Sequence, residues 1–158
     1  MDRMPRETKG FMKAVVDCRC PSTVFERWAK QAFPGYVPSP DRMWVGGNAE
    51  IIHAGPEQWL VCAPIEEDEH LLKLMQAGVV SASMSLVEVS DAYRFFVVGG
   101  TDMYERMSEL TSLNVRRMRV PSATFTESFG LKALVVRKEG RFEVGYDSSY
   151  ATMISNIL

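Results

Sequence analysis

Short apolar runs joined by tight turns constrain the fold of this chain more than any other feature of its sequence. The turn Gly55-Pro56-Glu57 separates the runs 49–54 and 58–63, which are rich in isoleucine, valine and tryptophan. The turn Lys138-Glu139-Gly140 lies between two further apolar runs. Turns of this length connect antiparallel strands, whereas parallel strands need a long crossover. The sequence therefore predicts β-hairpins and mostly antiparallel sheets.

Proline and glycine divide the rest of the chain into elements. The residues 34–47 contain three prolines and three glycines and predict a loop. The turn Ser90-Asp91-Ala92 predicts a hairpin between the runs 79–89 and 93–98. Alternation of apolar and polar residues in 141–146 predicts a strand with only one face on the core, which leaves Glu143 on the other face. The remaining expected strands cover 12–18, 123–128 and 131–137.

Apolar residues at helical spacing predict four helices. Their expected starts are Pro21-Ser22, the acidic run 66–69, Thr101 or Asp102, and Ser148 or Ser149. Gly78 should end the second of them. Few helices beside many hairpins predict an α+β fold with two-layer packing and helices on one face of each sheet.

The length of 158 residues is that of about one domain. Residues 1–11, with a proline and many charges, predict a flexible N-terminal arm. Residues 12–158 then form a single domain or, because the element order recurs loosely, two intertwined lobes that meet near 78–84. No residue-level repeat decides between these two arrangements.

Charge and composition exclude several classes of protein. The formal net charge is -2, which disfavours nucleic acid and anionic membranes as partners. No apolar run reaches membrane-spanning length and the start lacks a signal-peptide core, so we expect a cytoplasmic protein. Three cysteines in such a compartment predict free thiols.

The residues that carry common chemistry do not form a recognisable catalytic pattern. There is no phosphate-binding loop and no GxGxxG after a strand. His53 is expected in a half-buried strand position and His70 on a helix surface, without zinc-hydrolase spacing. Cys62 lies between apolar neighbours, which predicts an inert thiol. We therefore assign no catalytic, cofactor-binding or metal-binding residue.

Two features are candidates for a subunit interface. Trp44, in the expected loop, either contacts a partner or covers the core. Arg116, Arg117 and Arg119 form the densest basic patch, which either pairs with acidic groups of a partner or is a solvated loop edge. An abundance of methionine, with 10 in the chain, is consistent with contact surfaces as well as with core packing.

Three ordered segments resemble one protein family. Gly55-Pro56-Glu57-Gln58-Trp59-Leu60-Val61 resembles the Gly-Pro-x-Glu/Gln-Trp-Leu segment of the gamma subunits of heterotetrameric sarcosine oxidases. The segment 89–99, with its Ser-Asp pair and final glycine, and the segment 141–149 follow in the family's order. The match extends from about residue 14 to residue 158. It implies a fold similar to that of the folate-binding aminomethyltransferases, reduced to two small lobes.

The resemblance also implies a function. In that family the gamma subunit is a structural partner without an active site, and the alpha, beta and delta subunits hold FAD, FMN, NAD, tetrahydrofolate and zinc. Here Gly100-Thr101-Asp102 replaces the family's Pro-Asp sequence, and Gly145-Tyr146-Asp147-Ser148-Ser149 replaces Val-Pro-Arg-Ser. The expected complex therefore oxidises sarcosine or a related N-methyl amine. The alternative is a free-standing folate-binding or aminomethyltransferase-like module.

Overall fold

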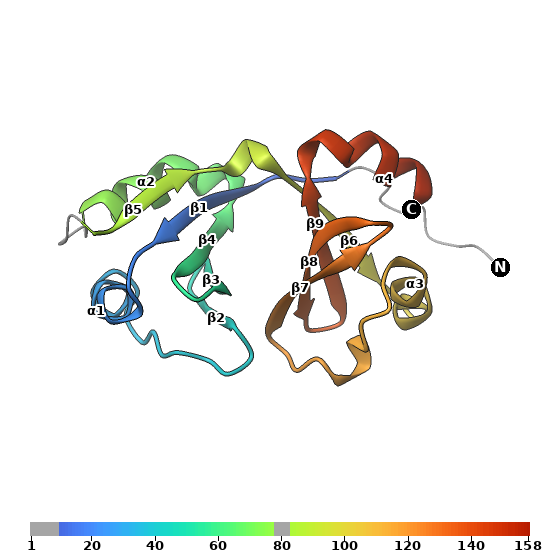
Figure 1. The fold of residues 1–158 in the computed structure, drawn as a ribbon, viewed down its shortest axis with the longest axis horizontal. Coiled ribbons are helices and arrows are strands. Elements are labelled where there is room, and N and C mark those ends of the chain that lie inside the picture. The colour runs from blue at the N-terminus through green and yellow to red at the C-terminus, as the bar shows by residue number, and fades with distance from the viewer. Residues whose placement is uncertain (1–9, 78–82) are drawn as a thin grey trace.

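The computed structural model of the chain describes residues 10–77 and 83–158. Two antiparallel sheets face each other at the centre of the molecule, and helices cover the outer face of each (Figure 1). The first sheet has five strands in the order β2-β3-β4-β1-β5, and the second has four in the order β6-β9-β8-β7. Each lobe is thus a two-layer α+β unit with helices on one face, as predicted, and the whole is an α/β/β/α sandwich.

The first lobe contains the described elements between residues 13 and 88. Its elements are β1 (Lys13–Arg19), α1 (Ser22–Ala32), β2 (Met43–Gly46), β3 (Ala49–Gly55), β4 (Gln58–Pro64), α2 (Asp68–Ala77) and β5 (Ser85–Glu88). The second lobe follows. Its elements are β6 (Tyr93–Gly99), α3 (Met103–Leu110), β7 (Ser122–Ser128), β8 (Leu131–Lys138), β9 (Arg141–Asp147) and α4 (Ala151–Ile157).

The hairpins predicted from the two tight turns are confirmed. Strands β3 and β4 pair across Gly55-Pro56-Glu57, with Ile51 opposite Val61. Strands β8 and β9 pair across the second turn, where Gly140 adopts the left-handed φ of 74° that favours glycine. Both registers place alternate side chains on the same face of their sheet.

The predicted hairpin between 79–89 and 93–98 is wrong. Strand β5 pairs with β1 in the first sheet, whereas β6 pairs with β9 in the second. A 3₁₀ turn over Ser90–Ala92 carries the chain from one sheet to the other. The described chain therefore passes from the first sheet to the second at this turn. Gly78 and the rest of 78–82 lie outside the described residues.

The expected loop 34–47 contains a strand. Met43–Gly46 forms β2 at the edge of the first sheet, where Trp44 lies opposite Ile51. The prolines precede this strand, so they do not interrupt its ladder. A second correction concerns the last helix, which no serine caps: α4 begins after Tyr150 without a side-chain cap. Asp147 instead caps the 3₁₀ turn Ser148–Tyr150 that leads into α4, because its Oδ1 accepts a hydrogen bond from the Ser149 backbone N–H at 2.9 Å.

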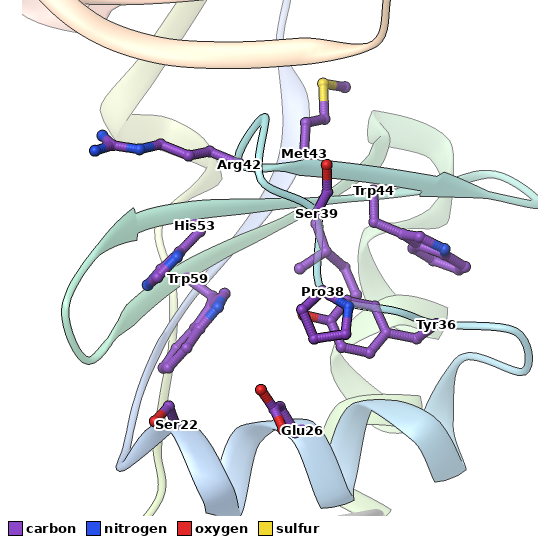
Figure 2. Close-up of a pocket in the computed structure, with 11 residues that line it drawn as sticks. Ser22, Glu26, Tyr36, Pro38, Ser39, Arg42, Met43, Trp44, His53 and Trp59 are labelled. Atoms are coloured by element: carbon purple, nitrogen blue, oxygen red, sulfur yellow. The ribbon is translucent and has the colours of Figure 1, made fainter.

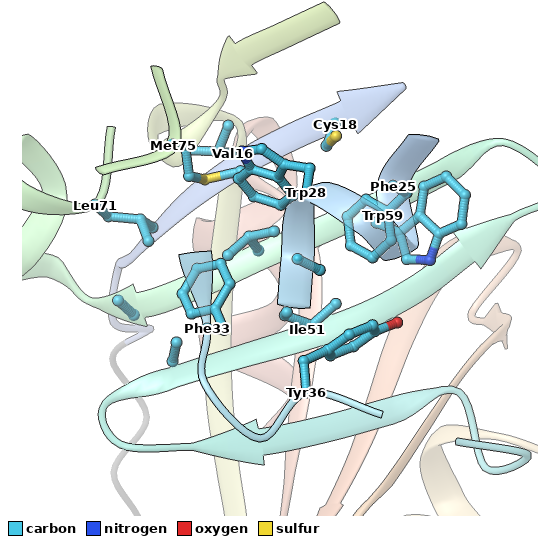
Figure 3. Packing of buried hydrophobic residues seen from close by; sticks show 14 of the residues in the cluster. Val16, Cys18, Phe25, Trp28, Phe33, Tyr36, Ile51, Trp59, Leu71 and Met75 are labelled. Atoms are coloured by element: carbon cyan, nitrogen blue, oxygen red, sulfur yellow. The ribbon is translucent and has the colours of Figure 1, made fainter. Parts of the chain in front are cut away.

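An aromatic core holds α1 against the first sheet (Figure 3). The rings of Phe25 and Trp59 stack with centroids 4.1 Å apart and an interplanar angle of 3°. Trp28 is fully buried beside them and contacts Phe33 edge to face. Aromatic pairs add to the large apolar area that each ring buries. This cluster fixes the helix on its sheet.

A third cluster fills the space between the two sheets. It joins Val15 and Leu60 of the first sheet to Phe95 and Leu134 of the second. Phe11, the last residue of the expected N-terminal arm, exchanges two backbone hydrogen bonds with Phe95 at 2.8 and 2.9 Å. Phe11 therefore lies against the second lobe, and the chain then continues into β1 of the first lobe. Residues 1–9 of the expected arm lie outside the described residues.

Candidate functional site

A cluster of four charged side chains lies where the two lobes meet. Lys13 from β1 and Glu50 from β3 belong to the first sheet, whereas Lys138 from β8 and Glu143 from β9 belong to the second. Lys13 Nζ lies 2.5 Å from Glu143 Oε1 and 3.5 Å from Glu50 Oε1. Lys138 Nζ lies 2.9 Å from the same two oxygens. Two cations and two anions therefore alternate across the junction.

The charged cluster is largely buried, so each of its charges depends on its partners for stabilisation. The side chains of Lys13 and Glu143 are only 6% and 5% exposed. Burial by itself lowers the pKa of Lys13, but Glu50 and Glu143 outweigh it and hold that pKa above its usual value. Burial likewise raises the pKa of Glu143, and the two lysines reverse this and hold it below its usual value. Lys13 and Glu143 are consequently both charged at neutral pH.

The cluster acts as an electrostatic lock between the sheets. Removing one member of a buried ion pair leaves an uncompensated charge, which is strongly destabilising. The Lys13 ammonium also lies 4.5 Å from the centre of the Phe95 ring, which connects the lock to the apolar interior of the junction. Oε2 of Glu50 is buried without a hydrogen-bond partner in the described structure. No local sequence signal identifies this cluster, because its four members come from four different strands.

A cleft of about 380 Å³ opens beside this lock. The first lobe contributes Val45 and the turn 47–50, and the second contributes Val120 and Pro121. Lys138 and Glu139 complete its walls. Val45 and Val120 are 48% and 50% exposed, which is unusual for valine. The cleft combines apolar walls with a few polar groups, as binding sites between domains do.

The three candidate arginines lie in the loop between α3 and β7, where Arg119 directly precedes Val120 of the cleft. All three are exposed. The guanidinium of Arg116 lies 4.5 Å from the centre of the Tyr104 ring, so its position is defined by a cation–π contact. The interface role predicted for these residues stays a prediction.

Trp44, the other candidate, lies on the first lobe and not with the arginines. Its ring contacts Phe33 and Tyr36 edge to face, with centroids 6.2 and 5.5 Å apart. The indole is half-buried and packs against the core of that lobe. This packing is the arrangement expected of a side chain that covers the core.

A second hollow, of about 90 Å³, lies beside Trp44 (Figure 2). Its charged or titratable groups are those of Glu26, Tyr36, Arg42 and His53. His53 is exposed rather than half-buried as expected, because it lies on the outer face of the Trp59 ring, stacked with centroids 5.0 Å apart. The space is that of a few water molecules. It offers no nucleophile paired with a base.

The cysteines are free thiols, as predicted, and all three are buried. Burial raises the pKa of Cys62 to about 12, although Lys13 opposes the shift, and burial together with Cys20 raises the pKa of Cys18. His70 lies on the exposed surface of α2, as predicted. Within residues 10–77 and 83–158, no three histidine, cysteine or acidic side chains are placed to hold a metal ion.

We expect the folded protein to resist thiol reagents. At about pH 8 a disulfide reagent should modify none of Cys18, Cys20 and Cys62, because the reactive thiolate is scarce and access is blocked. Denaturant should release all three thiols. Absorbance of the released thiolate measures both states. Modification of the native protein at the rate of a free thiol would contradict the burial described here.

Among the described residues, no helix has both the length and the apolar character needed to span a membrane. Comparison with family models and with curated proteins finds no match. Comparison with solved structures does find matches, and these define the fold.

Heterotetrameric sarcosine oxidase from Corynebacterium sp. U-96, solved in complex with pyrrole 2-carboxylate, contains a chain similar to this one. The TM-score is 0.72 at 17% identity, over 91% of this chain and 76% of the other. Aminomethyltransferase T of the glycine cleavage system from Bartonella henselae matches with a TM-score of 0.71 at 7% identity, over 94% of this chain. This chain spans 45% of that enzyme. The predicted fold relation to both classes of protein is therefore confirmed.

Proposed function

We propose that this protein is a non-catalytic, gamma-type subunit of a cytoplasmic, flavin-dependent heterotetrameric oxidase. That enzyme removes a methyl group from sarcosine or a related N-methyl amine and passes the one-carbon unit to tetrahydrofolate. The observation that carries the proposal is the shared fold, which covers 91% of this chain and 76% of a chain in a heterotetrameric sarcosine oxidase. The ordered sequence segments around Trp59, Gly99 and Arg141 support it.

The proposed partners are alpha, beta and delta subunits, and they would hold FAD, FMN, NAD, tetrahydrofolate and zinc. This chain would bind none of these groups itself. The buried lock between its lobes supports such a role, because a rigid body presents a fixed surface at low entropic cost on assembly. Lys13 and Glu143 contribute to that rigidity by joining the two sheets.

Co-expression with the large subunits encoded nearest to this chain tests the proposal. We expect one peak in size exclusion that contains this protein and absorbs as a bound flavin, at micromolar concentration. Separate elution of folded partners, with this chain in a colourless peak of its own, would overturn the proposal.

The second candidate function is a free-standing folate-binding module. It is favoured by the match of 94% of this chain to an aminomethyltransferase and by the cleft between the lobes. Titration of the isolated chain with tetrahydrofolate, followed by calorimetry, discriminates the two. Saturable binding by the chain alone favours the module, and the subunit proposal predicts no binding heat.

A further inference from the structure

The arginine loop carries positive charge that the described chain does not neutralise. Arg116, Arg117 and Arg119 are exposed, and none of them forms an ion pair with a described carboxylate. Three like charges within four positions repel one another, and an opposite charge from outside relieves that repulsion. Their concentration here contrasts with the formal net charge of -2 for the whole chain.

Arg116 is held in place before any partner arrives. Its guanidinium lies on the Tyr104 ring, and the Tyr104 hydroxyl accepts a hydrogen bond from Arg137 Nη2 at 3.2 Å. Arg137 Nη1 in turn donates to the backbone oxygens of Lys138 and Arg141 at 2.8 and 3.2 Å. An arginine fixed in this way loses less side-chain entropy when it binds.

An apolar anchor site adjoins these charges. Val120 follows Arg119 directly and lines the cleft of about 380 Å³, which Val45 lines from the other lobe. Exposed apolar walls rimmed by polar groups are typical of sites for protein partners. A side chain that enters between Val45 and Val120 would contact both lobes at once.

The charges of the side chains in the walls of the cleft nearly cancel. Lys138 is paired with Glu50 and Glu143 of the lock, and Glu139 adds one negative charge. The three arginines therefore carry the unpaired positive charge that precedes Val120 in the chain, and the partner that complements them is acidic.

We propose that the arginine loop and the adjoining cleft together bind an acidic polypeptide segment of a partner protein. An apolar side chain of the segment occupies the cleft between Val45 and Val120, and its carboxylates pair with Arg116, Arg117 and Arg119. The apolar anchor site favours a polypeptide over nucleic acid. This inference deepens the proposed function, on which it rests, by naming the chemistry through which a larger subunit would dock.

The test uses a fluorescent acidic probe peptide of glutamates with two leucines and the full-length chain, followed by fluorescence anisotropy. We expect saturable binding that weakens at least about tenfold in the triple variant Arg116→Glu, Arg117→Glu, Arg119→Glu. Raising the salt from about 50 to about 500 mM should also weaken it. The matched control reverses three exposed charges on α1 and α2, Arg27→Glu, Lys30→Glu and Lys73→Glu, and should bind as the unchanged protein does.

Apolar anchoring is tested by Val120→Asp against the exposed control Val37→Asp. Val120→Asp should weaken binding of the probe peptide, whereas Val37→Asp should not, because Val37 lies outside the cleft. A probe with glutamine in place of glutamate should bind at least about tenfold more weakly. Circular dichroism confirms that each variant is folded.

Equal binding of the acidic probe to the triple variant and its control would overturn the proposal. Tighter binding of a duplex DNA oligonucleotide than of the acidic probe would assign this site to nucleic acid instead. The proposed function fails separately: if the probe binds but no flavin-bearing subunit co-elutes, the acidic-segment site stands and the subunit role falls. If the chain co-elutes and the triple variant does so equally well, the subunit role stands and the site falls.

Discussion

Replacement of Lys13 by methionine should lower the free energy of unfolding by about 3–5 kcal/mol. The variant keeps an apolar stem of similar length but leaves Glu50 and Glu143 with Lys138 as their only lysine partner at the junction. Both carboxylates would then repel each other in a poorly solvated space. Urea denaturation followed by circular dichroism measures the loss.

Two further variants make this result specific to the lock. Lys30→Met, on the exposed surface of α1, should change the free energy of unfolding by no more than about 0.5 kcal/mol. The double variant Lys13→Met, Glu143→Gln should lose less than the sum of its single changes, because the removal of both charges leaves fewer unpaired groups. Additive losses would show that the two side chains are not coupled.

The lock should also shape the pH dependence of stability. The pKa of Glu143 is lowered in the folded protein, so its contribution is present above the ordinary carboxyl range and is lost as the pH falls through the folded value. The pKa of Lys13 is raised, so its contribution is present below the ordinary lysine range and is lost as the pH rises through the folded value. Stability from this pair is therefore greatest between those two ranges.

Replacement of Trp28 by alanine should lower the free energy of unfolding by about 3–5 kcal/mol. The ring is fully buried, contacts Phe25 and Phe33, and leaves a large cavity when it is removed. Trp28→Phe should lose clearly less, because it keeps an aromatic ring and removes an indole N–H that is buried without a hydrogen-bond partner in the described structure. The same urea titration measures both variants.

The control for Trp28→Ala is Tyr150→Ala, which removes an aromatic ring from the surface. Tyr150 is 41% exposed, so its loss should change stability by less than about 0.5 kcal/mol. If Trp28→Ala were as stable as this control, the aromatic cluster of the first lobe would not be the core that holds α1 to its sheet. The arrangement in Figure 3 would then be contradicted.

The sequence predicted those elements that local chemistry determines. The turns at Gly55 and Gly140 identified both confirmed hairpins, because loop length and glycine conformation set the pairing there. Local signals could not show that β5 and β6 join different sheets, since Ser90–Ala92 reads equally well as a hairpin turn. They also missed β2, whose four residues are too few for a clear pattern.

The candidate site was harder to predict because it depends on tertiary contacts. Alternation in β9 placed Glu143 on the face opposite the core, which is where it lies, but that face is covered by the first sheet. Its partner Lys13 is 130 positions away in the chain, so no spacing rule connects the two. The three arginines, in contrast, are close together in the sequence and could be identified as a basic patch. Trp44 could be identified because it is a large aromatic residue in a segment expected to be a loop.

Native mass spectrometry of this chain, tagged and purified from its own host, tests the central claim most directly. We expect one copy of the chain in a complex with larger subunits, together with bound flavin. We also expect this complex to oxidise an N-methyl amine. A species at the mass of the chain alone, 17.8 kDa, with the flavin-bearing subunits present but unassociated, would show that the chain is not a subunit of such an oxidase.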